Sequence, residues 1–205
     1  MTSTAAFSRA IEDLELQLKR TPPVTTAFVE YRFSHLLKKP LRTSGTLQYR
    51  SDGVLARTVD TPYREVTEVA GDQVRISRGD KPVRTLSLQR APQLRMLLGS
   101  FRALLEGKLV PLQQDFEVTL LQDGPTLWTL TLKPRDAQLA RHLASIEVFG
   151  SGDHPACVQA REPDGDGAIT LMGEAPAASA TLTTRAELER SCRAGGAHGA
   201  ADSQR

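Results

Sequence analysis

The side chains that could do chemistry are few and far apart. The four histidines, His35, His142, His154 and His198, include no close pair, and none stands at a metal-binding spacing from Asp, Glu or Cys. Asp164-Gly165-Asp166-Gly167 offers two carboxylates, but it lacks the third acidic position and the closing Glu of a calcium loop, and it fits a hairpin turn. The sequence therefore predicts no metal site, no cofactor and no catalytic residue. An enzyme would need two titratable groups that only the fold brings together.

Motifs for other activities are also absent. The chain has no Gly-x-Ser-x-Gly elbow, and its glycine-dense segments match neither a phosphate loop nor a dinucleotide fingerprint. The formal charge is only +2, and Lys38-Lys39 is the one adjacent basic pair that stands out, at an expected strand end. We expect no nucleic-acid partner, because phosphate binding needs clustered positive charge.

The two cysteines are Cys157 and Cys192. One lies in a predicted strand and the other in a polar, Gly- and Ala-rich segment. The sequence allows a disulfide between them but does not support one. Cys157 is predicted to be a small, buried hydrophobic side chain in its strand.

The elements that must position any site are mostly strands. Alternating apolar and polar residues, with turn signals about every 8–12 residues, are typical of β-sandwiches and barrels. Asp52-Gly53, for example, favours a tight hairpin. The predicted strands are Thr25–Leu37, Leu41–Arg50, Val54–Val59, Tyr63–Ala70, Gln73–Arg78, Pro82–Leu88, Asp115–Leu121, Leu127–Leu132, Ile146–Gly150, Ala156–Glu162 and Ala168–Met172.

Helices are few. Phe7, Ile11, Leu14 and Leu18 form one apolar stripe that ends before Pro22-Pro23. A second helix opens at Ala91-Pro92, and Pro134–Leu143 fits a short third one. A run of strands with so few helices predicts a mainly β fold and argues against alternating βαβ units. A large antiparallel sheet with a sparse helical cover suggests a cavity and a carried ligand.

The predicted organisation is one domain over residues 1–174 and a mobile tail over 175–205, with a helical turn at Arg185–Arg193. No apolar run approaches the ~20 residues of a membrane helix. Met1–Ala6 does not read as a signal peptide, which predicts a cytoplasmic protein if Met1 is the true start.

Several segments, in this order, resemble the periplasmic lipoprotein carriers, the LolA-like proteins. They are Phe28-Val-Glu-Tyr-Arg32, Leu41–Tyr49, Leu55-Ala-Arg57 with Pro62, Pro92-Gln-Leu94, Asp115-Phe116-Glu117 and Leu127-Trp128-Thr-Leu-Thr-Leu-Lys-Pro134. The resemblance runs from the first helix to about Met172, and it is closest to a divergent branch without the usual tryptophan-rich strands.

The resemblance implies a half-open antiparallel β-barrel of about eleven strands under an α-helical lid. It also implies a non-enzymatic, monomeric periplasmic chaperone that shields the acyl chains of a lipoprotein or lipid on the way to the outer membrane. Donor and acceptor proteins would stand at the inner and outer membranes. The expected cavity lining is Val29, Tyr31, Phe33, Leu47, Tyr49, Leu55, Trp128 and Leu130 from the sheet, with Leu94, Leu97, Leu98, Phe101, Leu104 and Leu105 from the lid.

One position departs from the family. An Arg at the end of the second strand holds the lid in the lipoprotein carriers, whereas this chain has Ser51 there and Arg50 one residue earlier. A shift of one residue turns a strand side chain to the other face. The alternative function is an interaction or sensor module with a filled interior on the same scaffold.

Overall fold

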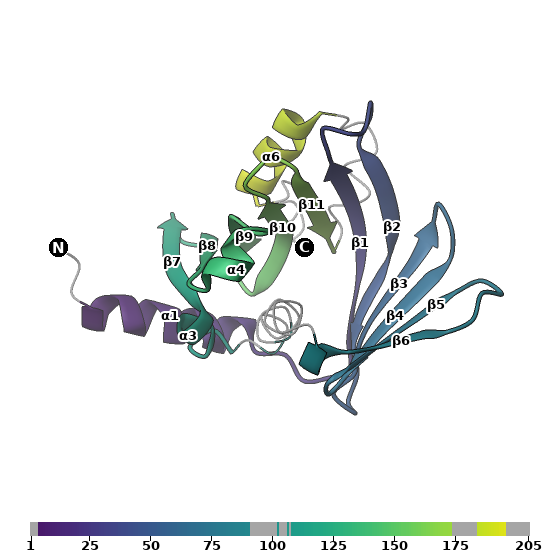
Figure 1. Ribbon diagram of the computed structural model, residues 1–205. Coiled ribbons are helices and arrows are strands. Elements are labelled where there is room, and N and C mark those ends of the chain that lie inside the picture. Colours follow the sequence, from purple (N-terminus) through teal and green to yellow (C-terminus); the bar gives the residue numbers. More distant parts are fainter. Residues whose placement is uncertain (1–3, 91–101, 103–105, 107, 174–183, 196–205) are drawn as a thin grey trace, which may run out of the picture.

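The computed structural model describes residues 4–90, 102, 106, 108–173 and 184–195 (Figure 1). The helices are α1 (Thr4–Leu18), α3 (Leu112–Asp115), α4 (Ala137–Ala140) and α6 (Arg185–Arg193), with a 3₁₀ turn at Leu88–Arg90. The strands are β1 (Val24–Phe33), β2 (Leu41–Tyr49), β3 (Leu55–Thr61), β4 (Glu65–Ala70), β5 (Gln73–Arg78), β6 (Arg84–Ser87), β7 (Phe116–Asp123), β8 (Leu127–Pro134), β9 (Ser145–Ser151), β10 (His154–Arg161) and β11 (Gly167–Met172).

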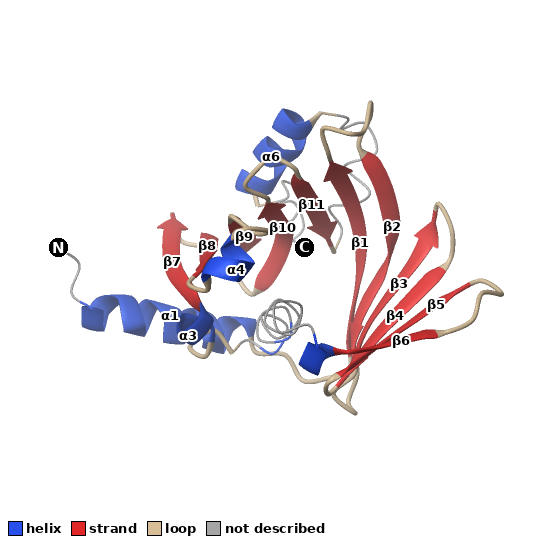
Figure 2. Ribbon diagram, viewed as in Figure 1, coloured by secondary structure: helices blue, strands red, loops and turns tan. Residues whose placement is uncertain are grey.

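All eleven strands form one antiparallel sheet in the order β6-β5-β4-β3-β2-β1-β11-β10-β9-β8-β7. Two meanders, β1–β6 and β7–β11, are joined where β1 pairs with β11. The sheet does not close, and the two meanders splay apart around α1 and α3 (Figures 1 and 2). The predicted mainly β fold, an open half-barrel of eleven strands, is confirmed.

The two faces of the sheet follow from its register. Phe28 on β1 pairs with Gly45 on β2 and with Met172 on β11, so these residues share one face, which we call the inner face. Val29 pairs with Ser44 and Leu171, which lie on the opposite, outer face.

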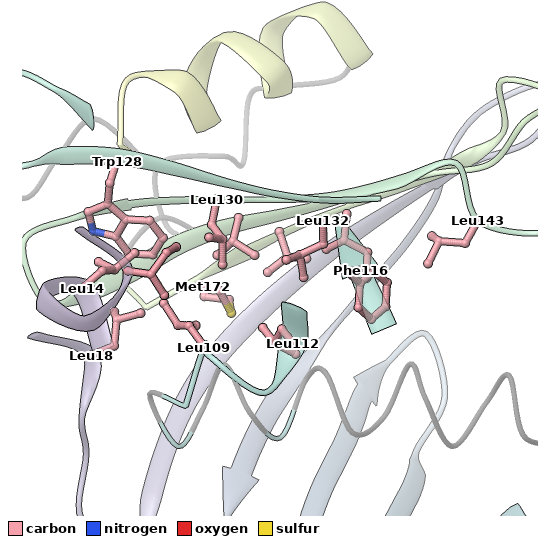
Figure 3. Packing of buried hydrophobic residues seen from close by; sticks show 14 of the residues in the cluster. Leu14, Leu18, Leu109, Leu112, Phe116, Trp128, Leu130, Leu132, Leu143 and Met172 are labelled. Carbon is pink, nitrogen blue, oxygen red and sulfur yellow. The ribbon is translucent and has the colours of Figure 1, made fainter. Parts of the chain in front are cut away.

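The inner face carries the larger core. Ile11, Leu14 and Leu18, the predicted stripe of α1, are buried against it, and Leu109, Leu112 and Phe116 close the same cluster. Figure 3 shows Leu14, Leu18 and Met172 on one side of the sheet with Trp128. Each fully buried side chain of this size stabilises the fold by about 1.5–3 kcal/mol. α1 is therefore held to the β7–β11 half by its apolar stripe.

The outer face carries a second core beneath α6. Leu188 and Cys192 of α6 are fully buried with Val29, Tyr31 and Leu171. A disulfide joins Cys157 on β10 to Cys192, so the reading of Cys157 as an unpaired buried side chain is wrong. The predicted helical turn at Arg185–Arg193 is present as α6, which packs on the sheet and is cross-linked to it.

Other differences concern element ends. β1 stops at Phe33, short of the predicted Leu37, because the next residues turn: the backbone N–H of Leu37 donates to the carbonyl of Ser34 at 2.9 Å. The predicted helix Pro134–Leu143 shortens to α4, which begins where the carboxylate of Asp136 accepts from the N–H of Leu139. Among the described residues, no helix has the length and apolar character needed to span a bilayer.

Candidate functional site: an apolar cavity on the inner face

The inner face contains a cavity of about 240 Å³ where the two meanders meet. This volume exceeds the ~150 Å³ of an apolar cavity that takes up benzene, and it lies just below the ~300 Å³ at which ordinary ligand pockets begin. Apart from two charged residues and two threonines, the lining is apolar. It comprises Leu18, Phe28, Glu30, Leu47, Leu55, Arg57, Thr67, Val69, Trp128, Val148, Pro155, Val158, Thr170 and Met172.

The strand register explains this composition. Leu55 pairs with Val69 and Arg57 pairs with Thr67, so alternate residues of β3 and β4 reach the cavity side by side. Across the seam, Met172 and Thr170 of β11 stand opposite Phe28 and Glu30 of β1. The cavity therefore draws on both meanders.

Trp128 forms part of the wall contributed by β8. Its indole N–H donates to the carbonyl of Gly152 at 2.8 Å, and its ring lies against Gly150, where any Cβ would overlap it. The missing side chain at Gly150 thus lets the indole lie flat on β9 with its polar atom satisfied.

Glu30 and Arg57 form an ion pair within the lining, with Arg57 Nη2 at 3.2 Å from Glu30 Oε1. An arginine side chain stays protonated, so the pair cannot act as a general acid and base. It is a fixed polar group within an apolar wall.

Tyr49, at the end of β2, makes a different contact. Its hydroxyl donates to the carboxylate of Glu106, which also accepts from Arg102 Nε at 2.7 Å and pairs with Lys108. Burial opposes ionisation of Glu106, but the hydrogen bonds from Arg102, Lys108 and Tyr49 outweigh it and lower the pKa of Glu106 to about 2. Donating that bond to the carboxylate stabilises the protonated phenol and, together with burial, raises the pKa of Tyr49.

Arg102 and Glu106 are both helical and belong to the segment predicted as the lid. Arg50 contacts neither of them. It donates to Glu68 at 3.0 Å and to Asp52 at 2.6 Å, which ties it to β4 and to the hairpin turn after β2. Among described residues, the link from the end of β2 to the lid segment is therefore made by Tyr49 rather than by Arg50.

The structure brings only some of the predicted sheet residues to the cavity. Leu47, Leu55 and Trp128 line it. Leu130 is fully buried within the inner core, and Tyr49 is buried near Glu106; neither is part of the lining.

Val29, Tyr31 and Phe33 lie on the outer face, so their predicted place in the cavity is wrong. All three belong to the core beneath α6, and the guanidinium of Arg185 lies 4.7 Å from the ring of Phe33. The alternation in β1 by itself predicts that its polar residues face outward. The helix on the outer face explains why the outward residues are apolar instead.

The six lid positions, Leu94, Leu97, Leu98, Phe101, Leu104 and Leu105, lie outside the described residues, and their role stays a prediction. Sequence reasoning missed the lining residues of α1, β1, β4, β9, β10 and β11, and Arg57 of β3. Phe28, opposite Gly45 and Met172, could have been found only from the strand pairing.

His35, Asp164 and Asp166 bring three metal-binding side-chain atoms within 4.8 Å of one another. Hydrogen bonds among these residues and the backbone explain why the three side chains lie close together. Asp166 accepts from the backbone N–H of His35 at 2.8 Å, and Asp164 accepts from the N–H of Asp166 at 3.0 Å. Hydrogen bonding, first from Ser34 and then from His35, lowers the pKa of Asp166. The group fastens the turn after β1 to the turn before β11.

A sequence model of the family described as outer membrane lipoprotein carrier protein LolA-like matches residues 4–195. The chain belongs to the LolA-like family. The match spans α1, the whole sheet and α6, so the helix placed in the predicted tail falls within the family region. A search of curated proteins found no match.

Three solved structures resemble this LolA-like chain at low identity. A LolA superfamily protein from Nitrosomonas europaea has a TM-score of 0.40 at 8% identity, covering 82% of this chain and 91% of its own. The MucA/MucB complex of Pseudomonas aeruginosa gives 0.42 at 12% identity, with 80% and 55% covered. LprF from Mycobacterium bovis gives 0.37 at 11%, with 80% and 92% covered.

Proposed function

We propose that this LolA-like protein is a non-enzymatic carrier that shields the acyl chain of a lipid or lipoprotein in the inner-face cavity. The observation that carries the proposal is the cavity itself, which is bounded by apolar side chains from both meanders. Each methylene removed from water contributes about 0.8 kcal/mol, so even part of an acyl chain would bind favourably there.

The cross-link supports the proposed compartment. Disulfides form and persist in oxidising environments such as the bacterial periplasm and are rare in the cytosol. The Cys157–Cys192 disulfide joins α6 to the sheet, which supports a periplasmic or otherwise extracytoplasmic carrier. Transfer toward the outer membrane, with donor and acceptor proteins on either side, is the route that the family description suggests.

The size of the cavity also favours a second candidate, a protein-interaction module. A volume of about 240 Å³ leaves less room than most lipid-sized ligands need, and much of the inner face near Leu130 and Leu132 is fully packed. In that case the open sheet would bind a partner chain and the cavity would stay empty.

The deciding experiment is native mass spectrometry, with lipid extraction, on the full chain purified from its own host under oxidising conditions. A carrier should arrive with a stoichiometric amphiphile that extraction releases and identifies. A protein that carries none, and that takes none up from detergent-dispersed host lipid, contradicts the carrier proposal and leaves the interaction module as the better account.

A further inference from the structure

A compact polar group lies at the apolar lining of the cavity, with three members in the lining and one, on β2, beside it. It consists of Glu30 on β1, Arg57 on β3, Thr43 on β2 and Thr170 on β11. Glu30 stands directly opposite Thr43 on one side and Thr170 on the other, so the four side chains gather on the inner face. We call them the polar cluster.

In the polar cluster both carboxylate oxygens accept a hydrogen bond, whereas some N–H donors of the guanidinium are unused within the described part of the chain. Glu30 uses both carboxylate oxygens: Oε1 accepts from Arg57 Nη2 at 3.2 Å, and Oε2 accepts from Thr170 Oγ1 at 3.3 Å. Arg57 Nη2 also reaches Thr43 Oγ1 at 3.4 Å. Arg57 Nε and Nη1 make no hydrogen bond with any residue that the structure describes.

The guanidinium of Arg57 is held in position and remains accessible. Its central carbon lies 4.7 Å from the centre of the Phe28 ring, an attractive contact that fixes the plane of the group. The side chains of Arg57 and Glu30 remain 30% and 25% exposed, in a cavity whose lining is otherwise apolar apart from two threonines. A ligand in the cavity would therefore meet oriented, unused N–H donors.

These donors discriminate between kinds of amphiphile. A guanidinium presents N–H groups in a geometry that matches the two oxygens of a carboxylate or phosphate. A neutral hydroxyl would gain less, because it offers the guanidinium one oxygen and no opposite charge. Phe28, Leu47 and Leu55 supply apolar surface beside the cluster for a chain.

We propose that Arg57 binds the oxyanion head group of an amphiphile whose chain lies along the apolar wall of the cavity. The inference rests on the proposed carrier function and narrows its cargo to molecules with a carboxylate or phosphate next to the chain. Glu30 positions the guanidinium and keeps its charge compensated when the cavity is empty.

The test is isothermal titration calorimetry of the full, oxidised chain with three probes of equal chain length: dodecanoate and dodecyl phosphate below their micelle concentrations, and dodecanol below its solubility limit. The wild type should bind at least one anion about tenfold or more tightly than the alcohol, as expected for a charge-assisted hydrogen bond. Arg57→Gln should remove that preference, so that neither anion binds more tightly than dodecanol.

Two further variants isolate the cause. Glu30→Gln combined with Arg57→Gln leaves no unpaired charge in the cavity, and it should bind all three probes with similar affinity. Arg75→Gln removes a positive charge from the exposed outer face of β5 and should keep the wild-type preference.

The outcomes separate the two proposals. Equal affinity of the wild type for anions and alcohol, unaltered by Arg57→Gln, overturns the role of Arg57 and leaves the carrier intact. If no probe binds to any variant that melts like the wild type, the carrier function itself fails. A preference for dodecanoate over dodecyl phosphate, or the reverse, assigns the head group as carboxylate or phosphate.

Discussion

At the scale of single residues, charged side chains gather where Tyr49 at the end of β2 contacts Glu106, which pairs with Arg102 and Lys108. Glu106 is 13% exposed and accepts hydrogen bonds from Arg102 and Tyr49. Because its folded pKa of about 2 lies below its ordinary value of 4.5, the ionised form is the one that stabilises this contact. The contribution is present above about pH 4.5 and is lost as the pH falls toward 2.

Glu106→Gln should therefore lower the free energy of unfolding by about 1 kcal/mol at pH 7, since its partners Arg102 and Lys108 remain largely exposed. The difference from the wild type should shrink toward zero between pH 4.5 and 2, where Glu106 takes up a proton. Urea denaturation at a series of pH values measures it. Glu117→Gln, on an exposed position of β7, serves as the control; a pH-independent deficit in Glu106→Gln would contradict this account.

At the scale of elements, α6 is attached in several ways to the outer face. Its start carries a capping box, in which Thr184 Oγ1 accepts from the N–H of Glu187 and the Glu187 carboxylate accepts from the N–H of Thr184. Its middle contacts the sheet through Glu189, which lies 3.0 Å from Gln159 Nε2. Its end is fixed by the disulfide at Cys192.

Removing the disulfide with Cys157→Ala and Cys192→Ala together should lower the free energy of unfolding by about 2–5 kcal/mol, because the bond constrains a span of 35 residues in the unfolded chain. Urea denaturation of the double variant and of reduced wild type should give matching midpoints. Midpoints equal to that of the oxidised wild type would show that packing alone holds α6.

Thr184→Ala should cost about 1 kcal/mol, the usual effect of losing a helix N-cap. Hydrogen exchange should locate the loss in the first turn of α6, with β7 and β8 unchanged. Thr119→Ala, at an exposed position of β7, provides the matched control. Uniformly faster exchange across the sheet in Thr184→Ala would instead indicate a global effect.

The elements themselves could be predicted because alternation and turn signals are local. Asp52-Gly53 marks the β2–β3 hairpin in the sequence as it does in the structure. Which residues of β1 face the cavity could not be predicted. Phe28 and Val29 are both buried, and in a strand covered on both sides the alternation of residues does not tell which face is the inner one. The helical turn of α6 could be predicted, but its disulfide and its place on the sheet could not, because they depend on packing between residues distant in sequence and α6 buries only Leu188 and Cys192. No local sequence pattern indicates the ion pair between Glu30 and Arg57 in the cavity.

At the scale of the whole molecule, an open sheet gives one chain two separate interiors. The inner face holds a core and a cavity, while the outer face holds a smaller core under α6. The cavity lies at the junction of the meanders, away from the disulfide. Changes that fill the cavity should therefore alter ligand uptake without disturbing the outer core.

Leu55→Trp tests this separation, because Leu55 is half-buried and lines the cavity from β3. The larger side chain should weaken dodecanoate binding more than tenfold while changing the free energy of unfolding by about 1–3 kcal/mol at most. Leu121→Trp, at a residue 64% exposed on β7, is the size-matched control and should bind as the wild type does. Undiminished binding by Leu55→Trp would place the ligand elsewhere.

Trp128 provides a way to measure the kinetics of ligand binding. It is the only tryptophan in the chain, it lines the cavity, and its ring is fixed by Gly150 and Gly152. Its emission comes from one site in one environment, so an arriving chain should change that signal without any label. Stopped-flow fluorescence can then time loading and release separately, and release is the step that the proposed carrier function requires after loading.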